Sequence, residues 1–242
     1  MSSASRWRSA AHTHAGKVRA RNEDAFLDAP EQGLWAVADG MGGHQGGDVA
    51  SQLIVASLAD LPTKEDFNER LTDIRQCLHW LNRRLGQELT LVAGRHDSIM
   101  GSTVVALLVE GNRAACIWAG DSRCYLWRGE QLYQLSKDHS LRQQLVDEQN
   151  LSAEHAEAYP GSHALTRAIG ADEQLTLDVL EFEVYPGDAF LLCSDGLYQE
   201  LSSAALGSAL SLTAPRVALE RLFDGALRGC ARDNLTAVVI RQ

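Results

Sequence analysis

The chain has 242 residues, of which 45% are hydrophobic and 22% are charged, values typical of a folded globular protein. Its net charge of −10 argues against a general nucleic-acid or anionic-membrane surface, because both need a basic footprint. No run of 18 apolar residues is present and the N-terminal residues lack a signal-peptide core, so we expect neither a membrane-spanning helix nor a secretory leader. The five cysteines are odd in number and include no C-x-x-C pair, which favours free thiols in a cytoplasmic protein.

The first elements expected are a strand and two helices. The apolar run at residues 34–38 predicts a short buried strand, and the glycine-rich stretch ADGMGGHQGG overlaps its end. Residues 47–61 and about 65–90 are predicted to be helical, the second because apolar side chains recur at steps of three and four. The glycines fit neither phosphate-loop pattern, so we expect them to let the chain turn after Asp39 and expose the Gly40 carbonyl.

The elements that follow are closely spaced strands and then a second group of helices. Apolar runs separated by tight polar turns occupy residues 102–109, 114–121, 122–128 and 132–136. This spacing is typical of an antiparallel meander. The remaining elements expected are short helices and loops over 139–170, strands at 175–185 and 188–195 around the turn Pro186-Gly187, helices at 202–210 and 214–229, and a last strand at 235–242. The pattern predicts one α+β domain, with helices packed over antiparallel sheets.

Aspartates stand where the apolar strands end. Asp39, Asp121 and Asp195 each follow such a run, and Asp233-Asn234 directly precedes the last one. Four carboxylates at strand ends could meet in one pocket, where they would repel each other unless a cation compensates them. An all-oxygen ligand set suits hard ions such as Mg²⁺ and Mn²⁺. The alternative is that Asp-Gly and Asp-Asn are simply common turn dipeptides.

The segment GKVRARNED at residues 16–24 adds an arginine and two acids. If residues 18–24 are extended, Arg19 and Glu23 point to one face and Asp24 to the other. A guanidinium beside a metal–carboxylate cluster would bind phosphate with two hydrogen bonds. A solvated charged strand is the alternative for this segment taken alone.

The ordered motifs of the chain resemble one family. They are G-x-V-R-x-x-N-E-D (16–24), A-D-G-M-G-G-H (38–44), G-S-T (101–103), G-D-S-R (120–123), D-H-S (138–140), L-T-R-A-I-G (165–170), S-D-G-L (194–197) and R-D-N-L-T (232–236). Each motif is weak alone, but eight in this order, across about residues 12–240, resemble the bacterial metal-dependent type 2C serine/threonine protein phosphatases. The resemblance implies a four-layer α-β-β-α sandwich of two antiparallel sheets flanked by helices.

The resemblance also implies a centre of two Mn²⁺ or Mg²⁺ ions. Asp39 would bridge the two ions, and the Gly40 carbonyl would bind one of them. Asp195 and Asp233 would hold the other ion, and Asp121 would help to bind a weaker third. Glu23 and Asp24 would orient metal-bound waters, and Arg19 would bind the substrate phosphate.

The activity implied is hydrolysis of phosphoserine and phosphothreonine in proteins by a metal-activated water, opposing a bacterial serine/threonine kinase. The expected partners are phosphorylated proteins and a kinase system, with no nucleic acid or membrane, and the chain is expected to be a monomer. Eukaryotic members read D-G-H-G-G, whereas this chain has Met41, so the general acid is either His44 or a metal-bound water.

The region from about 138 to 170 resembles the family's flap beside the active site, but residues 159–163 depart from the usual stretch, so substrate preference does not carry over. Two other functions stay open. Cys77 and Arg83 fit the C-x₅-R spacing of thiol phosphatases, although the segment between them lacks glycine and reads as helix. A catalytically weak or inactive regulatory module of the same fold is the second alternative, and a two-metal phosphodiesterase or nuclease is disfavoured by the acidic composition.

Overall fold

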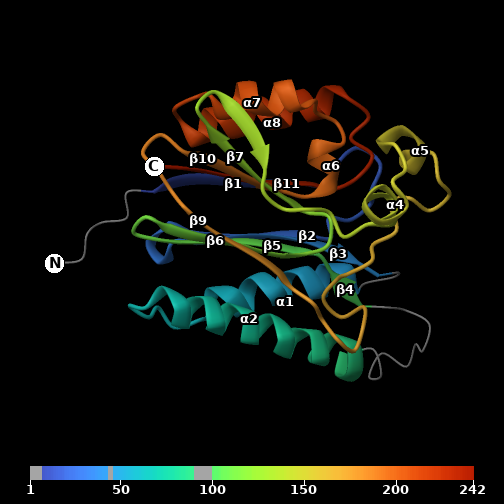
Figure 1. The fold of residues 1–242 in the computed structure, drawn as a ribbon, viewed down its shortest axis with the longest axis horizontal. Coiled ribbons are helices and arrows are strands. Elements are labelled where there is room, and N and C mark those ends of the chain that lie inside the picture. Colours follow the sequence, from blue (N-terminus) through green and yellow to red (C-terminus); the bar gives the residue numbers. More distant parts are fainter. Residues whose placement is uncertain (1–6, 43–45, 90–99) are drawn as a thin grey trace.

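The computed structural model describes residues 7–42, 46–89 and 100–242, which form four layers in the order helices, sheet, sheet, helices (Figure 1). The strands are β1 (Arg8–His14), β2 (Asp24–Ala29), β3 (Leu34–Met41), β4 (Gly101–Ser102), β5 (Val104–Glu110), β6 (Arg113–Ala119), β7 (Arg123–Arg128), β8 (Gln131–Gln134), β9 (Asp178–Glu183), β10 (Ala189–Cys193) and β11 (Leu235–Arg241). The α-helices are α1 (Gly47–Ala59), α2 (Phe67–Arg83), α4 (Leu141–Gln149), α5 (Ala153–Glu157), α6 (Asp195–Tyr198), α7 (Ser203–Leu210) and α8 (Pro215–Arg228). A 3₁₀ turn, Pro30–Gln32, joins β2 to β3, and a π-helical stretch, Arg84–Leu89, extends α2.

The two sheets are antiparallel throughout. One has the strand order β1-β11-β10-β7-β8, and the other has the order β2-β3-β5-β6-β9, with β4 paired to β3. Helices α1 and α2 cover the second sheet, and α7 and α8 cover the first (Figure 1). The α+β sandwich predicted from the sequence is therefore confirmed.

Strands in the middle of this stack bury both of their faces. On β3, Ala36 and Ala38 belong to the apolar core beneath α1 and α2, while Trp35 and Val37 belong to the core between the sheets. A third core lies between the first sheet and α7 and α8. Successive side chains of a strand point to opposite faces, so a strand with cores on both sides reads as an unbroken apolar run.

The predicted meander is wrong in its connections. β5 and β6 form a hairpin in one sheet, and β7 and β8 form a hairpin in the other. The chain changes sheets at residues 120–122, and it changes again at the turn Pro186-Gly187 between β9 and β10. Gly120 makes the first change possible, because its φ of +116° is strained for other residues and a Cβ there would lie 2.6 Å from that of Thr103. Short turns reveal that strands are consecutive but not which sheet each joins.

Two N-terminal strands, β1 and β2, were not predicted. β1 carries few large apolar residues and pairs with a single strand, β11. The extended conformation considered for residues 18–24 is also wrong, because they form turns and bends until β2 begins at Asp24. Arg19 and Glu23 therefore lie on a loop.

The predicted helices are confirmed within one to two residues at most ends, and α2 with its π-helical extension covers 67–89. Cys77 lies in the third turn of α2, and burial raises the pKa of its thiol to about 11. A nucleophilic thiol needs a lowered pKa, so this geometry contradicts the C-x₅-R alternative. All five cysteines are free thiols, as expected. In the part of the chain that the structure describes, every helix is too short or too polar to cross a bilayer.

Candidate active site

Two of the predicted acids face each other across a pair of strands. Asp24 begins β2 and stands opposite Asp39 near the end of β3. Asp24 is 6% exposed, and its Oδ2 accepts a hydrogen bond from Ser194 Oγ at 2.7 Å. Its Oδ1 is buried without a hydrogen-bond partner. An unpartnered oxygen at this depth is costly unless another charge or donor compensates it.

The other three aspartates come from connections between elements. Asp121 lies between β6 and β7, Asp195 opens α6 after β10, and Asp233 lies two residues before β11. Gln199 donates to Asp195 Oδ2 at 2.8 Å, and Asp233 Oδ1 accepts the backbone N–H of Asn234 at 2.9 Å. The structure thus places carboxylates from both sheets at one end of the sandwich.

These carboxylates are close enough to change one another's ionisation. Burial raises the pKa of Asp39 well above its ordinary value, and the charges of Asp24, Asp195, Asp121 and Asp233 raise it further. Burial, then the charge of Asp195, raises the pKa of Asp121 to about 7. Burial, opposed by bonds from Thr236 and Ser194, raises the pKa of Asp24 to about 6. The pKa of Asp195 is raised by burial and by Asp233. Such a cluster favours a bound cation or a shared proton.

The glycines beside Asp39 serve packing. The expected turn at Gly40 is wrong, because β3 continues through it to Met41. Gly40 N–H donates to Glu23 O at 3.1 Å, and a Cβ on Gly40 would lie 2.1 Å from Gly47 O. Only glycine lets β3 approach both the loop before β2 and the start of α1. The Glu23 carboxyl is held nearby, where burial and then Asp48 raise its pKa.

Arg19 reaches the carboxylates from the exposed side. Its Nη2 lies 2.6 Å from Asp233 Oδ2, with the two side chains 56% and 37% exposed. This hydrogen bond, with the charges of Asp233, Asp39 and Glu23, raises the pKa of Arg19. One guanidinium nitrogen is used in the pair, so Arg19 keeps other N–H donors for an anion.

Among the remaining predicted residues, His44 lies outside the described part of the chain. The predicted flap lies beside Asp121: a pocket of about 220 Å³ is lined by Asp121 and by Ser140, Arg142, Glu157 and His163 of the flap, with further residues from the sheet and α6.

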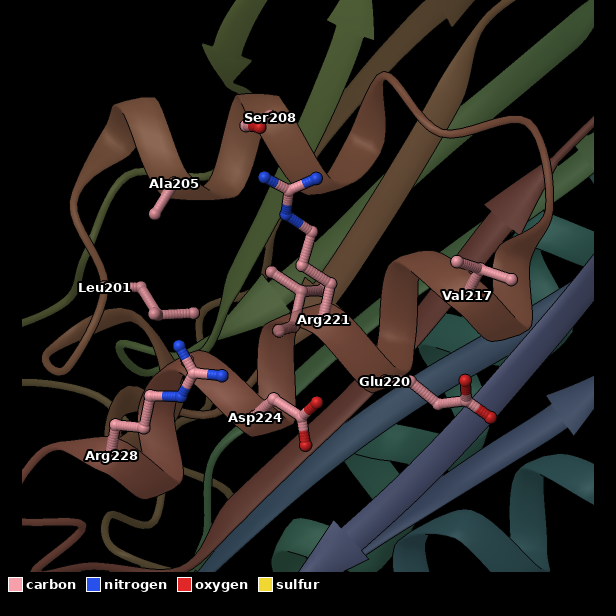
Figure 2. Close-up of a pocket in the computed structure, with 10 residues that line it drawn as sticks. Leu201, Ala205, Ser208, Val217, Glu220, Arg221, Asp224 and Arg228 are labelled. Carbon is pink, nitrogen blue, oxygen red and sulfur yellow. The ribbon is translucent and has the colours of Figure 1, made fainter.

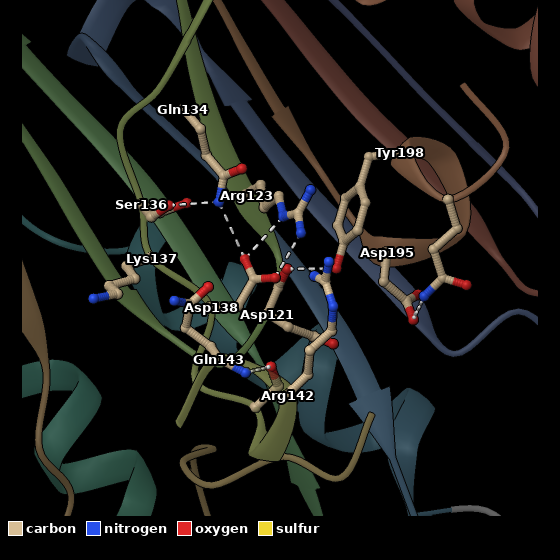
Figure 3. A network of polar contacts seen from close by, with 12 residues as sticks. Asp121, Arg123, Gln134, Ser136, Lys137, Asp138, Arg142, Gln143, Asp195 and Tyr198 are labelled. Carbon is tan, nitrogen blue, oxygen red and sulfur yellow. Dashed lines mark hydrogen bonds and ion pairs between the residues drawn. The ribbon is translucent and has the colours of Figure 1, made fainter. Parts of the chain in front are cut away.

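Figure 3 shows the network that joins the cluster to the flap. Arg123 makes two hydrogen bonds to Asp138, at 2.8 and 2.6 Å, and its guanidinium stacks 3.7 Å from the Tyr198 ring centre. The Tyr198 hydroxyl donates to the backbone oxygen of Asp121 at 3.0 Å. The backbone at Asp121 is therefore held by Tyr198, whose ring stacks on the guanidinium that pairs with Asp138 at the start of the flap.

Sequence reasoning missed Asn234 as an organising residue. Its Oδ1 accepts the Glu23 N–H at 2.8 Å, and its Nδ2 donates to Ala15 O and Arg21 O at 3.0 and 2.9 Å. The Asn234 side chain is 6% exposed and ties the Arg19 loop to the segment that carries Asp233. The R-D-N-L-T motif contains this asparagine, but its partners lie more than 200 residues away in the chain.

Thr103 and Ser194 were also missed. Thr103 N–H donates to Asp39 O at 2.9 Å, its Oγ1 accepts the Asp39 N–H at 3.1 Å, and its hydroxyl bonds to that of Ser122 at 2.7 Å. Ser194 bonds Asp24 and also accepts the Thr236 N–H at 3.0 Å. Both residues lie inside motifs noted above, which was the available signal.

The donor set fits a hard divalent ion in kind: carboxylate oxygens with raised pKa values, one of them buried without a partner. As they stand, however, the described Asp, Glu, His and Cys side chains form no group of three close enough to hold an ion.

A larger pocket, of about 480 Å³, lies between α7 and α8 (Figure 2). Arg221, Asp224 and Arg228 of α8 line it opposite Ala205 and Ser208 of α7. It contains none of the predicted site residues, so size alone does not identify the site.

Known proteins are similar to this chain over most of its length. The family model described as protein phosphatase 2C matches residues 9–235. The serine/threonine protein phosphatase PstP of Mycobacterium tuberculosis is 38% identical over 233 residues, which are 96% of this chain and 44% of that protein. The chain therefore spans less than half the length of this curated relative.

Two solved structures are similar over almost the whole chain. PppA, described as a key regulatory component of T6SS in Pseudomonas aeruginosa, is 44% identical with a TM-score of 0.89, and 97% of each chain is covered. The catalytic domain of PstP, solved in complex with 2 manganese ions, is 36% identical with a TM-score of 0.82, again with 97% of each chain covered.

The family match extends from β1 into β11 and includes all five clustered aspartates. The four layers and their helical covers are those of the similar solved structures. The chain belongs to the protein phosphatase 2C family.

Proposed function

We propose that this chain is a metal-dependent phosphatase that hydrolyses phosphoserine and phosphothreonine in proteins. The observation that carries the proposal is the convergence of Asp24, Asp39, Asp121, Asp195 and Asp233 from both sheets beside an exposed arginine. Membership of the protein phosphatase 2C family supports it.

Each residue of the cluster has a proposed task. Asp39, Asp195, Asp233 and the Gly40 carbonyl hold two Mn²⁺ or Mg²⁺ ions, and Asp121 contributes to a weaker third. When bound, the ions supply positive charge for the phosphoryl group and activate a water. Support for two ions comes from the manganese complex of the PstP catalytic domain.

The substrate phosphate is proposed to bind Arg19. The Asp233 carboxylate orients the guanidinium toward the cluster, and the remaining N–H donors can take two phosphate oxygens. Glu23 and Asp24 line the cluster and orient water, while Asn234 keeps the Arg19 loop in register with Asp233. His44 is kept as a candidate general acid, with water as the alternative.

The cellular setting is also proposed. The chain acts as one catalytic domain over 1–242, with a flap at about 138–170, as a cytoplasmic monomer that reverses a serine/threonine kinase. The names of its relatives as serine/threonine phosphatases support phosphoprotein substrates. The likeness to PppA supports a regulatory setting such as a secretion system.

The test is hydrolysis of p-nitrophenyl phosphate and of a phosphothreonine peptide, with Mn²⁺ and with EDTA, by wild type and Asp39→Asn. We expect Mn²⁺-dependent turnover that the substitution abolishes. Equal activity of the two proteins, or no activity with any divalent ion, would contradict the proposal. Inhibition by iodoacetamide alone would favour the thiol mechanism, which the raised pKa of Cys77 argues against.

A further inference from the structure

Four cations lie on the two loops that adjoin the carboxylate cluster: Lys17, Arg19, Arg21 and Arg232, here called the basic rim. Residues 16–21 contain three cations and no carboxylate, and residues 229–232 contain one cation and no carboxylate, in a chain of net charge −10. The two loops themselves therefore carry positive charge, unlike the chain as a whole.

The two loops that carry the basic rim are joined to each other. Lys17 N–H donates to Ala231 O at 2.8 Å, and Lys17 Nζ donates to Gly229 O at 2.9 Å. The Asn234 amide holds both ends of the first loop through Ala15 O and Arg21 O. A surface fixed in this way loses little conformational entropy when a ligand binds.

The basic rim is open to solvent and adjoins the proposed phosphate site. Residues 17–21 and Arg232 are exposed. Arg19 bonds Asp233, and the charges of Arg19 and Arg21 oppose the rise that burial causes in the pKa of Glu23. Neither Arg21 nor Arg232 forms an ion pair with any residue in 7–42, 46–89 or 100–242. Two guanidinium groups beside the site are thus available to an incoming anion.

One carboxylate outside the proposed metal centre lies against the same loops. Glu200 accepts the backbone N–H groups of Cys230 and Ala231 at 3.0 and 2.9 Å. Its oxygens are engaged by the backbone of the second loop, and it forms no ion pair with Arg232. It supports the loop without pairing with Arg21 or Arg232.

We propose that the basic rim binds acidic side chains that flank the phosphorylated residue of a protein substrate. The inference rests on the proposed phosphatase function and adds a substrate class to it. With the phosphate held at Arg19, residues on either side of it pass over Lys17, Arg21 and Arg232. Because the rest of the molecule is acidic, this patch also determines where an anionic segment can approach.

The experiment compares two phosphothreonine peptides that differ only in having Glu or Gln at the flanking positions. We expect kcat/KM at low salt to be about tenfold higher for the Glu peptide, since two or three exposed charge pairs contribute modestly each. The Arg21→Gln/Arg232→Gln variant should reduce this ratio to about twofold, and 0.5 M NaCl should reduce it in wild type by screening. The matched control is Arg75→Gln. It removes an exposed charge from α2, which does not carry the basic rim, and should retain the wild-type ratio.

Turnover of p-nitrophenyl phosphate, which has no flanking residues, tests the phosphatase function separately from the basic rim. Mn²⁺-dependent turnover with equal kcat/KM for the two peptides would overturn the basic rim and leave the phosphatase function standing. A Glu/Gln ratio that persists in the double variant would also overturn it. Absence of turnover of all three substrates would overturn the proposed function, and the rim with it.

Discussion

The interior of the sandwich and its carboxylate end are built from the same strands, but they contribute to the stability of the fold with opposite sign. On β3, Trp35 and Val37 are fully buried in an apolar core, whereas Asp39, two residues later, lies among carboxylates that raise its pKa. Apolar burial stabilises the fold, while clustered, desolvated carboxylates oppose it. Stability and activity therefore reside in different residues, so substitutions should separate them.

The largest separation is expected for Asp39→Asn. Loss of a central carboxylate should lower kcat/KM for p-nitrophenyl phosphate with Mn²⁺ by about a thousandfold. In EDTA the same variant should be as stable as wild type or more so, because one repelling charge is gone. Thermal unfolding in EDTA measures this, with Asp224→Asn, an exposed acid on α8, as the control. A clearly destabilised Asp39→Asn protein would contradict this separation of stability from activity.

The opposite result is expected for Leu78→Ala. Leu78 is fully buried on α2 against the second sheet, and removing it leaves a cavity. The free energy of unfolding should fall by about 3 kcal/mol, while kcat/KM per folded molecule stays within about twofold. Urea unfolding checks the first value, and Val217→Ala, at an exposed position, should change it by less than about 0.5 kcal/mol. Loss of turnover in the folded fraction would contradict the separation.

Asn234→Ala is an intermediate case, in which both stability and activity should fall. The side chain satisfies one backbone N–H and two carbonyls, so its loss should cost about 2 kcal/mol of unfolding free energy. Misplacement of the Arg19 loop should raise KM for p-nitrophenyl phosphate more than it lowers kcat. Asn234→Asp restores one acceptor but no donor, so it should not rescue KM. Wild-type kinetics in both variants would show that the loop does not need this anchor.

The smallest effect expected is a pH dependence in EDTA. Burial raises the folded pKa of Asp24 to about 6, above its ordinary value near 4. A raised carboxyl pKa contributes stability below its unfolded value that is lost as pH rises through the folded value. Between pH 4.5 and 6.5, wild type should therefore lose on the order of 2 kcal/mol relative to Asp24→Asn. Urea unfolding at several pH values tests this, and parallel curves would contradict it.

The sequence pattern predicted the helices, their packing over antiparallel sheets and the aspartates at strand ends, because apolar runs and the acids that end them are local features. The four-layer arrangement was implied by the family resemblance. The pattern did not predict the sheet membership of β7 and β10, which depends on how the chain bends at Gly120 and at Pro186-Gly187. The role of Asn234 was also hidden, since its partners are brought together only by folding. Local pattern thus identified candidate ligands, and long-range contacts revealed what holds them.

A count of bound ions tests the proposed metal centre most directly. Mn²⁺ titration followed by electron paramagnetic resonance, which detects free Mn²⁺, should give about two tightly bound ions per wild-type chain. Asp39→Asn should lose that binding, and Asp224→Asn should retain it. No tight binding by wild type, or equal binding by Asp39→Asn, would contradict the claim that the converging carboxylates are a metal centre.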